Sequence, residues 1–322
     1  MLVVFLKMVD IIIVNWNSGD YLEKCINSIF SVNNRTYVKN IFIIDNNSKD
    51  SSLERIKLHD KIQIIQNKEN LGFARASNQG FKLSRAPYIL LLNPDTQLLD
   101  STLEDCISFM EKNQYEKNQY IDILGCRLLN DKGEVTPSCA RFPTPGKLFV
   151  DSIGLSKILP SVFNPAILMT DWDHKTSRFV DQVMGAFMFM RESVFEKIGF
   201  FDERFFVYFE DLDFSKRLST TGGKSFFNAD ISAIHSGKGT TETVKPFRLF
   251  LNLRSRLQYA NKHFTVSGYS LVWLGTYFIE PISRVSYLFF RGKFSEIKSV
   301  LKGYKMLLNK TKKISDTKFV MK

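Results

Sequence analysis

Four short apolar runs in the first third of the chain predict β-strands. They are rich in isoleucine, leucine and valine, and they span Val9–Val14, Lys39–Ile44, Ile62–Gln66 and Tyr88–Leu92. Between them, apolar residues recur at helical spacing and predict helices over Tyr21–Phe30, Ser51–Leu58 and Phe73–Leu83. Asp20 is the expected N-cap of the first helix. This alternation predicts an α/β fold with a mostly parallel central sheet flanked by helices.

Each of these strands ends in amides or acids. The clusters are Asn15-Trp16-Asn17, Asp45-Asn46-Asn47, Asn67 with Asn70, and Asn93-Pro94-Asp95. Because ligands of open α/β sheets bind beyond the carboxyl ends of the strands, we expect these clusters to meet at one crevice. Turn formation explains any single cluster equally well, since Asn and Asp are common turn residues. Four clusters at the same edge favour a binding site.

An irregular segment separates the two halves of the chain. Residues Val135–Ser177 contain five prolines and no sustained period, which predicts a functional flap near the crevice. Regular patterns return with a buried strand over Phe179–Met190. They continue with helices that begin at Arg191 and that span Leu212–Leu218 and Pro246–His263.

The composition indicates a globular protein of 322 residues. With 44% hydrophobic residues, 17 Gly and 9 Pro, the chain is neither disordered nor collagen-like. Its four cysteines form no Cys-x-x-Cys pair, so we expect free, mostly buried thiols in a reducing compartment. The apolar start, Met1–Leu6, is too short for a signal-peptide core, and no secretion signal is predicted.

The net charge of +11 is concentrated at the end of the chain. Residues 291–322 contain ten Lys or Arg against Glu296 and Asp316. The uncharged segment Phe264–Ile279 precedes them, and its 16 residues fall short of the roughly 20 that a spanning helix needs. An aromatic segment followed by a basic tail predicts peripheral contact with an anionic membrane leaflet rather than with nucleic acid. A helical hairpin packed on the core or on a second subunit explains the segment equally well.

Several common catalytic motifs are absent from the sequence. No Gly-x-Gly-x-x-Gly follows the first strand, and Gly222-Gly223-Lys224-Ser225 is no P-loop because Leu218 stands where that motif requires glycine. Metalloprotease, serine-hydrolase and kinase signatures are also missing. The remaining candidate is a crevice of carboxylates and amides.

Two acidic groups are candidates for chemistry. Asp95 follows the fourth strand, where a carboxylate can hold a hard divalent cation together with substrate phosphates. The second group, Glu210-Asp211-Leu212-Asp213, follows the aromatic run Phe205–Phe209, which would partly desolvate the first acids and make a better base. Acids also favour the first turn of a helix through its dipole, so this second group has a structural explanation as well.

Six blocks of the sequence, in a fixed order, support a more specific hypothesis. They are Ile11–Asn17, Ile44–Ser48, Asn67–Ala74, Leu91–Thr96, Gly185-Ala186 and Phe201–Asp213. Over roughly Val9 to His263 they resemble the family 2 glycosyltransferases, especially the bacterial rhamnosyltransferase-like branch. The resemblance implies a GT-A-like glycosyltransferase domain over residues 1–263, with a nucleotide-binding half at 9–130 and an acceptor-binding half at 131–263. The basic helical extension would cover 264–322.

The resemblance also implies roles for individual residues. It assigns the nucleotide and its diphosphate to Asn15, Asn17, Asp45, Asn47, Arg75, Asn78 and Asn93. Asp95 and His235 would hold Mg²⁺ or Mn²⁺, although Asn93 replaces the first acid of the family's Asp-x-Asp motif and is a weaker, neutral ligand. Asp211 matches the general base. The acceptor would lie near Gly185, Ala186 and Glu210, where core packing is the alternative explanation.

The implied reaction is inverting transfer of a sugar to a hydroxyl of a bacterial surface glycan. We expect rhamnose from a nucleotide diphosphate donor such as dTDP-rhamnose, a lipid-linked acceptor, and a cytoplasmic protein that is peripheral on the inner face of the membrane and forms homo-oligomers. A nucleotidyltransferase is the nearest enzymatic alternative, but its first strand should open into a Gly-rich loop. The other alternative is a non-catalytic subunit of an assembly that binds a nucleotide sugar. In such a protein, the presence of Asn93 in place of an acid would reflect a partial loss of the catalytic residues.

Overall fold

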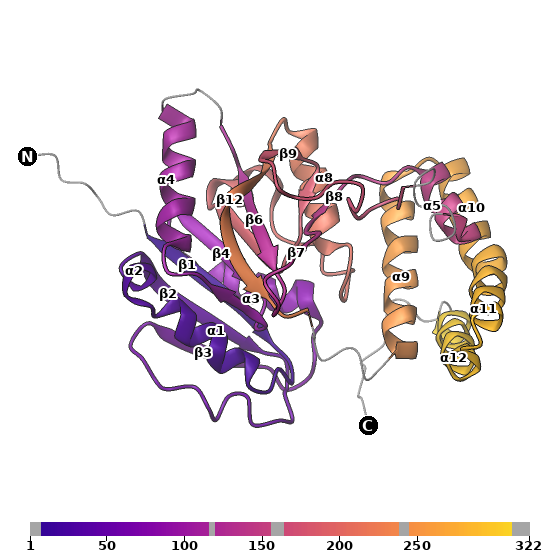
Figure 1. The fold of residues 1–322 in the computed structure, drawn as a ribbon, viewed down its shortest axis with the longest axis horizontal. Helices are drawn as coiled ribbons and strands as arrows, with labels where there is room; N and C mark the ends of the chain where they lie inside the picture. The colour runs from indigo at the N-terminus through magenta and orange to yellow at the C-terminus, as the bar shows by residue number, and fades with distance from the viewer. Residues whose placement is uncertain (1–7, 116–119, 156–163, 238–244, 311–322) are drawn as a thin grey trace, which may run out of the picture.

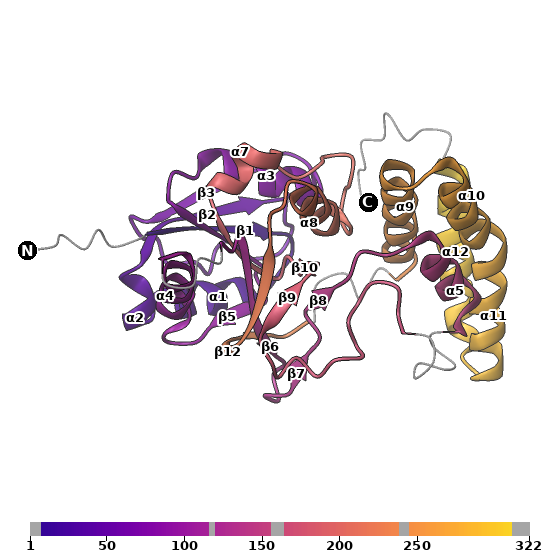
Figure 2. The ribbon, with the colours of Figure 1, turned by 90° about the horizontal axis from the view of Figure 1, so that it is seen from above.

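A computed structural model describes residues 8–115, 120–155, 164–237 and 245–310. A central sheet with helices on both faces forms one part of the molecule, and a layer of helices from the last third of the chain forms the other (Figures 1 and 2). The last twelve residues of the basic tail and part of the predicted flap lie outside the described residues.

The first four strands form the parallel part of the central sheet. They are β1 (Val9–Asn15), β2 (Val38–Asp45), β3 (Ile62–Gln66) and β4 (Tyr88–Leu92), in the spatial order β3-β2-β1-β4. All four predicted strands are confirmed within one or two residues. In β1, Ile11 and Ile13 pack on one face of the sheet while Ile12 and Val14 pack on the other. Burial of both faces explains why these strands are continuously apolar.

The second half of the sheet is mixed. Strand β11 (Phe187–Arg191) is antiparallel to β4 and to β6 (Ile123–Leu129), whereas β12 (Ser225–His235) is parallel to β6. Five short strands complete the pairing: β5 (Thr96–Leu98) and β9 (Arg178–Val180) pair with β12, β7 (Val135–Thr136) pairs with β6, and β8 (Cys139–Ala140) pairs with β10 (Gln182–Val183) in a second, small sheet. The α/β architecture expected from the sequence is therefore confirmed.

Helices cover both faces of the sheet. One face carries α1 (Tyr21–Ile29) and α4 (Thr102–Tyr115), and the other carries α3 (Phe73–Leu83), α7 (Ser193–Ile198) and α8 (Glu210–Thr220); the short α2 (Val32–Arg35) follows α1. The described cysteines are free and buried, as predicted: Cys25, Cys106, Cys126 and Cys139.

The C-terminal helices form a separate layer with its own core. It contains α9 (Lys245–His263), α10 (Val266–Leu274), a π-helix over Gly275–Ile279, α11 (Glu280–Phe290) and α12 (Phe294–Lys310), joined by α5 (Pro145–Ile153). Because α9 packs with α10–α12, the predicted boundary after His263 falls inside this layer rather than at its edge. Among the described residues, no helix combines the length and the apolar character needed to cross a bilayer.

Two local predictions are wrong, and a third holds only in part. Residues 51–58 form turns instead of a helix, because Asp50 and Asn15 hold the Ser52 hydroxyl and side-chain hydrogen bonds of this kind compete with helix formation. Asp20 stands at the N-cap position of α1 as predicted, but its side chain makes no capping hydrogen bond and instead pairs with Arg55. The strand predicted over Phe179–Met190 is divided into three: β9 pairs with β12, β10 with β8, and β11 with β4 and β6.

Asp10 provides a stability test of this fold. It is fully buried in β1, where it accepts hydrogen bonds from Asn40 Nδ2, Ser84 Oγ and the backbone N–H groups of Arg85 and Ala86. Asp10→Ala leaves these buried donors without an acceptor, so we expect the free energy of unfolding to fall by about 3 kcal/mol. Urea denaturation measures the change.

Asp60→Ala is the matched control, because Asp60 is exposed and its recorded ion pair is with the adjacent His59. If Asp10→Ala lowers the free energy of unfolding no more than Asp60→Ala does, the hydrogen-bond network assigned to Asp10 is contradicted.

Candidate active site

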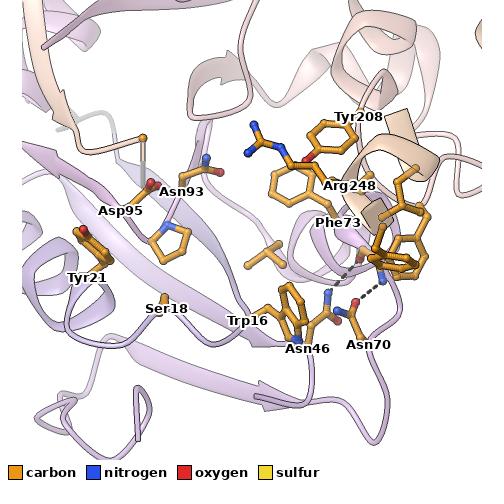
Figure 3. Close-up of a pocket in the computed structure, with 18 of the residues that line it drawn as sticks. Trp16, Ser18, Tyr21, Asn46, Asn70, Phe73, Asn93, Asp95, Tyr208 and Arg248 are labelled. Carbon is orange, nitrogen blue, oxygen red and sulfur yellow. Dashed lines mark hydrogen bonds between the residues drawn. The ribbon is translucent and has the colours of Figure 1, made fainter. Parts of the chain in front are cut away.

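A pocket of about 350 Å³ lies at the carboxyl ends of the parallel strands (Figure 3). Strand ends, the turn before α3, the loop before α8 and helix α9 all contribute to its lining: Val14, Trp16, Ser18, Tyr21, Asn46, Asn70, Gly72, Phe73, Asn93, Pro94, Asp95, Phe206, Val207, Tyr208, His235, Gly237, Phe247, Arg248 and Leu251. Segments that are far apart in the sequence therefore converge here, as the polar strand ends predicted.

Two amides shape one side of the pocket. Asn46 Nδ2 donates to the carbonyl of Gly72 at 3.1 Å, and Asn70 Oδ1 accepts from the Gly72 N–H at 2.9 Å (Figure 3). Asn67 adds a further hydrogen bond to Asn46 Oδ1 at 3.0 Å. These bonds fix the turn that leads into α3, so the amides support the pocket wall as well as facing it.

The turn at Gly72 is in close contact with the loop that precedes α8. The Phe73 N–H donates to the Phe206 carbonyl at 2.6 Å, and a Cβ added at Gly72 would overlap that same carbonyl oxygen. Gly72 has φ of 85°, a conformation that favours glycine. Tyr208 and Phe209 also have positive φ, 68° and 69°, and strained residues of this kind cluster at functional sites.

A carboxylate and an imidazole face each other at the other end of the pocket. Asp95 Oδ1 lies 3.3 Å from His235 Nε2, and the Ser236 N–H donates to the Asp95 carbonyl at 3.1 Å. Asn93 lines the pocket beside them (Figure 3). No third His, Cys, Asp or Glu joins this pair among the described residues. A carboxylate and an imidazole fit a divalent cation whose remaining ligands are phosphate oxygens and water.

Asp211 is held by peptide N–H groups near the pocket. Its Oδ2 accepts from the Gly185 N–H at 3.0 Å, and its Oδ1 accepts from the Leu212 N–H at 2.8 Å. A Cβ at Gly185 would lie 3.7 Å from Cε1 of Phe73, which lines the pocket. Burial raises the pKa of the Asp211 carboxyl above its ordinary value, and the hydrogen bonds from Gly185 and Leu212 oppose part of this rise.

The two neighbouring acids have contrasting surroundings. Glu210 is buried, and its Oε2 has no hydrogen-bond partner among the described residues. Burial is the main cause that raises its pKa well above the ordinary value, and the charge of Asp211 adds to the rise. Asp213 is also fully buried, but hydrogen bonds from His263, Lys262 and Arg217 outweigh the effect of burial and lower its pKa. Through His263 and Lys262, Asp213 joins α8 to α9.

Several residues assigned to the nucleotide do not face the pocket. Asn15 and Asp45 lie opposite each other on β1 and β2, so Asn15 Nδ2 donates to Asp45 Oδ1 at 2.8 Å and both side chains are buried. Asn17 and Asn47 both have positive φ, and their side-chain oxygens accept hydrogen bonds from Lys49. These hydrogen bonds satisfy the side chains within the protein, and the four residues are not among those that line the pocket, so their contact with the nucleotide stays a prediction.

The same holds for the two residues assigned to the diphosphate and for Ala186. Asn78 is buried and exchanges hydrogen bonds with the backbone of Phe201, at 2.9 and 3.0 Å. Arg75 is exposed outside the pocket lining and lies 3.7 Å from Glu203. Ala186 is buried, and its carbonyl accepts from the Asn93 N–H at 3.0 Å. Ala186 therefore positions Asn93 through its backbone.

The sequence did not reveal other residues of the pocket. Arg248, on α9, is the one arginine or lysine among the described residues that line it. No local pattern identified Arg248, because it reaches the pocket only through the packing of α9. Trp16 could have been predicted from the sequence. Neighbouring residues at the end of a strand point in opposite directions, so Asn15 and Trp16 are not expected to face the same crevice, and the structure places Trp16 in the lining.

Comparisons with known proteins support a glycosyltransferase. Residues 10–121 match the family model described as Glycosyl transferase family 2. The low-salt glycan biosynthesis hexosyltransferase Agl10 of Haloferax volcanii is 28% identical over 264 residues, covering 80% of this chain and 77% of that protein. The N-acetylglucosaminyl-diphospho-decaprenol L-rhamnosyltransferase of Mycobacterium tuberculosis is 21% identical, covering 71% of this chain and 76% of its own length.

A solved structure is similar in fold. It is the mannosyltransferase PcManGT from Pyrobaculum calidifontis in complex with GDP-Man and Mn²⁺, with a TM-score of 0.55 and 10% identity. The superposition covers 97% of this chain and 89% of that one. At this identity the likeness concerns the fold, and it agrees with the GT-A-like architecture expected from the sequence.

The surroundings of Glu210 predict how stability depends on pH. Because its pKa is raised in the folded protein, the folded state binds the proton more tightly than the unfolded state does. The free energy of unfolding therefore falls as the pH rises above the ordinary pKa of glutamate, by at most about 1.4 kcal/mol per pH unit. Glu210→Gln removes this contribution, so the variant gains stability relative to the native protein as the pH increases.

Urea denaturation from about pH 5 to pH 8 measures the difference in slope. The exposed Glu54 supplies the control, Glu54→Gln, which should leave the slope unchanged. Parallel pH profiles for the native protein and Glu210→Gln would show that Glu210 ionises normally in the folded state.

Proposed function

The chain is a glycosyltransferase that carries a family 2 domain over residues 10–121, and we propose that it transfers rhamnose from a nucleoside diphosphate donor to a hydroxyl of a lipid-linked surface glycan. The proposal rests on one observation: Asp95, His235 and Arg248 converge on a single pocket at the carboxyl ends of the sheet, while Asp211, outside the lining, is hydrogen-bonded to Gly185, which lies next to the pocket residue Phe73. Rhamnose and the lipid-linked acceptor are supported by the name of the mycobacterial relative.

We assign the diphosphate of the donor to the region between Asp95 and Arg248. The guanidinium group of Arg248 supplies positive charge and donors suited to phosphate oxygens, while Trp16 and Tyr21 offer aromatic surfaces to the nucleoside. The Arg75 assignment is replaced, because Arg75 lies outside the pocket lining.

Asp95 and His235 are the residues that would hold a divalent cation, Mg²⁺ or Mn²⁺. The similar mannosyltransferase structure contains Mn²⁺, which supports a metal of this class. Bound there, the ion would act as a Lewis acid and neutralise charge on the departing nucleoside diphosphate. Asn93 contributes an amide, a neutral donor that adds less to the affinity than a second carboxylate would.

Asp211 is the proposed general base. Its carboxylate accepts the proton of the acceptor hydroxyl while that oxygen forms a bond to the anomeric carbon and the bond from this carbon to the nucleoside diphosphate breaks. Attack opposite the leaving group inverts the anomeric centre. The Gly185 and Leu212 N–H groups orient the carboxylate, and its raised pKa makes it a stronger base than an exposed aspartate.

The alternatives from the sequence have less support. A nucleotidyltransferase should have a Gly-rich loop after β1, whereas Asn15-Trp16-Asn17-Ser18-Gly19 stands there. A non-catalytic subunit would not need a peptide-held carboxylate beside the pocket, and the relatives are named as transferases.

Asp211→Asn tests the proposed chemistry. Asparagine retains the shape of aspartate but is not a base, so we expect the transfer rate to fall by about 10²- to 10⁴-fold while donor binding persists. Transfer from dTDP-rhamnose to an N-acetylglucosaminyl diphospholipid measures the rate, and calorimetric titration measures binding. The exposed Asp230→Asn is the control. Transfer by Asp211→Asn at the native rate would exclude Asp211 as the base.

Arg248→Gln tests the assigned position of the diphosphate. Loss of a charge-assisted hydrogen bond should weaken donor binding by about tenfold to 100-fold, measured by titration with dTDP-rhamnose and Mn²⁺. Arg75→Gln serves as a matched control that should bind normally, since Arg75 is exposed and paired with Glu203. Equal losses in the two variants, or a loss only in Arg75→Gln, would contradict the assignment.

A further inference from the structure

The outer side of the C-terminal helices carries a continuous row of exposed apolar residues. We call it the apolar stripe, and it consists of Leu274, Phe278, Ile282, Phe289, Phe290 and Phe294. The first four are separated by four, four and seven residues, which is the spacing of one helix face. The rings of Phe290 and Phe294 lie 5.9 and 5.6 Å from that of Phe289, so the stripe continues from α11 onto α12.

The inner side of the same helices is already covered. Val272, Tyr304 and Leu307 are buried in the core that these helices share with α9 and α5, and Leu288 of α11 is also buried. Glu280 anchors the inner side electrostatically, because it is buried between Arg256 and Arg284. Packing of a helical hairpin on the protein therefore explains the burial of the inner side but leaves the exposed apolar residues of the outer side unexplained. Ile282, with 68% of its surface exposed, and Phe290, with 85%, remain on the outer side.

Exposed positive charge borders the apolar stripe. Arg291 and Lys293 follow Phe290 directly, and Lys298, Lys302 and Lys305 are exposed along α12. Among the described residues from 264 to 310, Glu280 is buried and Glu296 lies within 4.0 Å of Lys293. The border of the stripe is therefore positive, with one partly exposed acid.

We propose that the apolar stripe docks on an anionic phospholipid bilayer, with α10 and α11 lying in the plane of the headgroups. The aromatic and aliphatic side chains would enter the acyl boundary, while Arg291 and Lys293 stay at the level of the lipid phosphates. The basic border favours this occupant over a second copy of the chain. A two-fold contact through the same stripe would bring the positive borders of both copies together.

Vesicle binding tests this proposal without donor or acceptor, so its outcome is separate from that of the proposed function. The full chain is sedimented with vesicles that contain phosphatidylglycerol and with vesicles of phosphatidylcholine alone. We expect binding to the anionic vesicles that weakens as salt is added. The variant with Phe278→Ser, Ile282→Ser and Phe289→Ser should lose more than about tenfold in vesicle affinity.

A control variant makes the same kind of change elsewhere. Leu58→Ser, Leu83→Ser and Leu99→Ser also replace exposed apolar residues, but these lie on the sheet domain and should leave vesicle binding unchanged. Arg291→Gln with Lys293→Gln should reduce the preference for anionic over neutral vesicles, whereas Lys57→Gln with Lys68→Gln should not. The thermal midpoint of each variant checks that it is folded.

Two results would overturn the proposal. One is vesicle binding by the folded stripe variant at the level of the native protein. The other is a dimer of the native chain in lipid-free buffer that the stripe variant converts to a monomer, since this would identify a second copy as the occupant.

Discussion

The close approach of the Phe206 carbonyl to Gly72 joins the turn before α3 to the loop before α8. A side chain at position 72 would occupy the space of that carbonyl, so the contact depends on glycine. The Phe73 N–H donates to the same oxygen and holds the loop that carries Tyr208 and Phe209 in left-handed conformations. Helix α8 begins directly after this loop. The position of Asp211 beside the pocket therefore depends on the absence of a Cβ at Gly72.

Within one turn of α8, three carboxyl groups differ because their hydrogen-bond partners differ. Asp213 accepts hydrogen bonds from His263, Lys262 and Arg217, and they lower its pKa despite complete burial. Asp211 has peptide N–H groups, which orient its oxygens and offset only part of the effect of burial. Glu210 Oε2 has no partner among the described residues, and its pKa rises furthest from the ordinary value. The oriented but incompletely compensated carboxylate, Asp211, is the one that we propose as the general base.

Helix α9 connects the pocket to the C-terminal layer. Arg248 lines the pocket, while Arg256, two turns later, is buried against Glu280 of α11. The ion pairs of Asp213 with Lys262 and His263 fix the far end of α9 to α8. The same rigid helix thus orders one wall of the pocket and supports the layer whose outer side carries the apolar stripe.

The sequence by itself determined the four parallel strands, the helices α1, α3, α8 and α9 and the polar strand ends, because the periodic burial of side chains leaves its pattern in the order of residues. It also selected Asp95 and His235, which line the pocket, and Asp211, which lies outside the lining. Only the tertiary structure decided which polar groups face the pocket. Asn15 and Asp45 bond to each other because β1 and β2 bring them into register. Arg248 lines the pocket and Arg75 does not, because packing brings α9 to the strand ends although Arg248 is more than 150 residues away from them in the sequence. Such choices depend on distances between elements, which local sequence patterns do not encode.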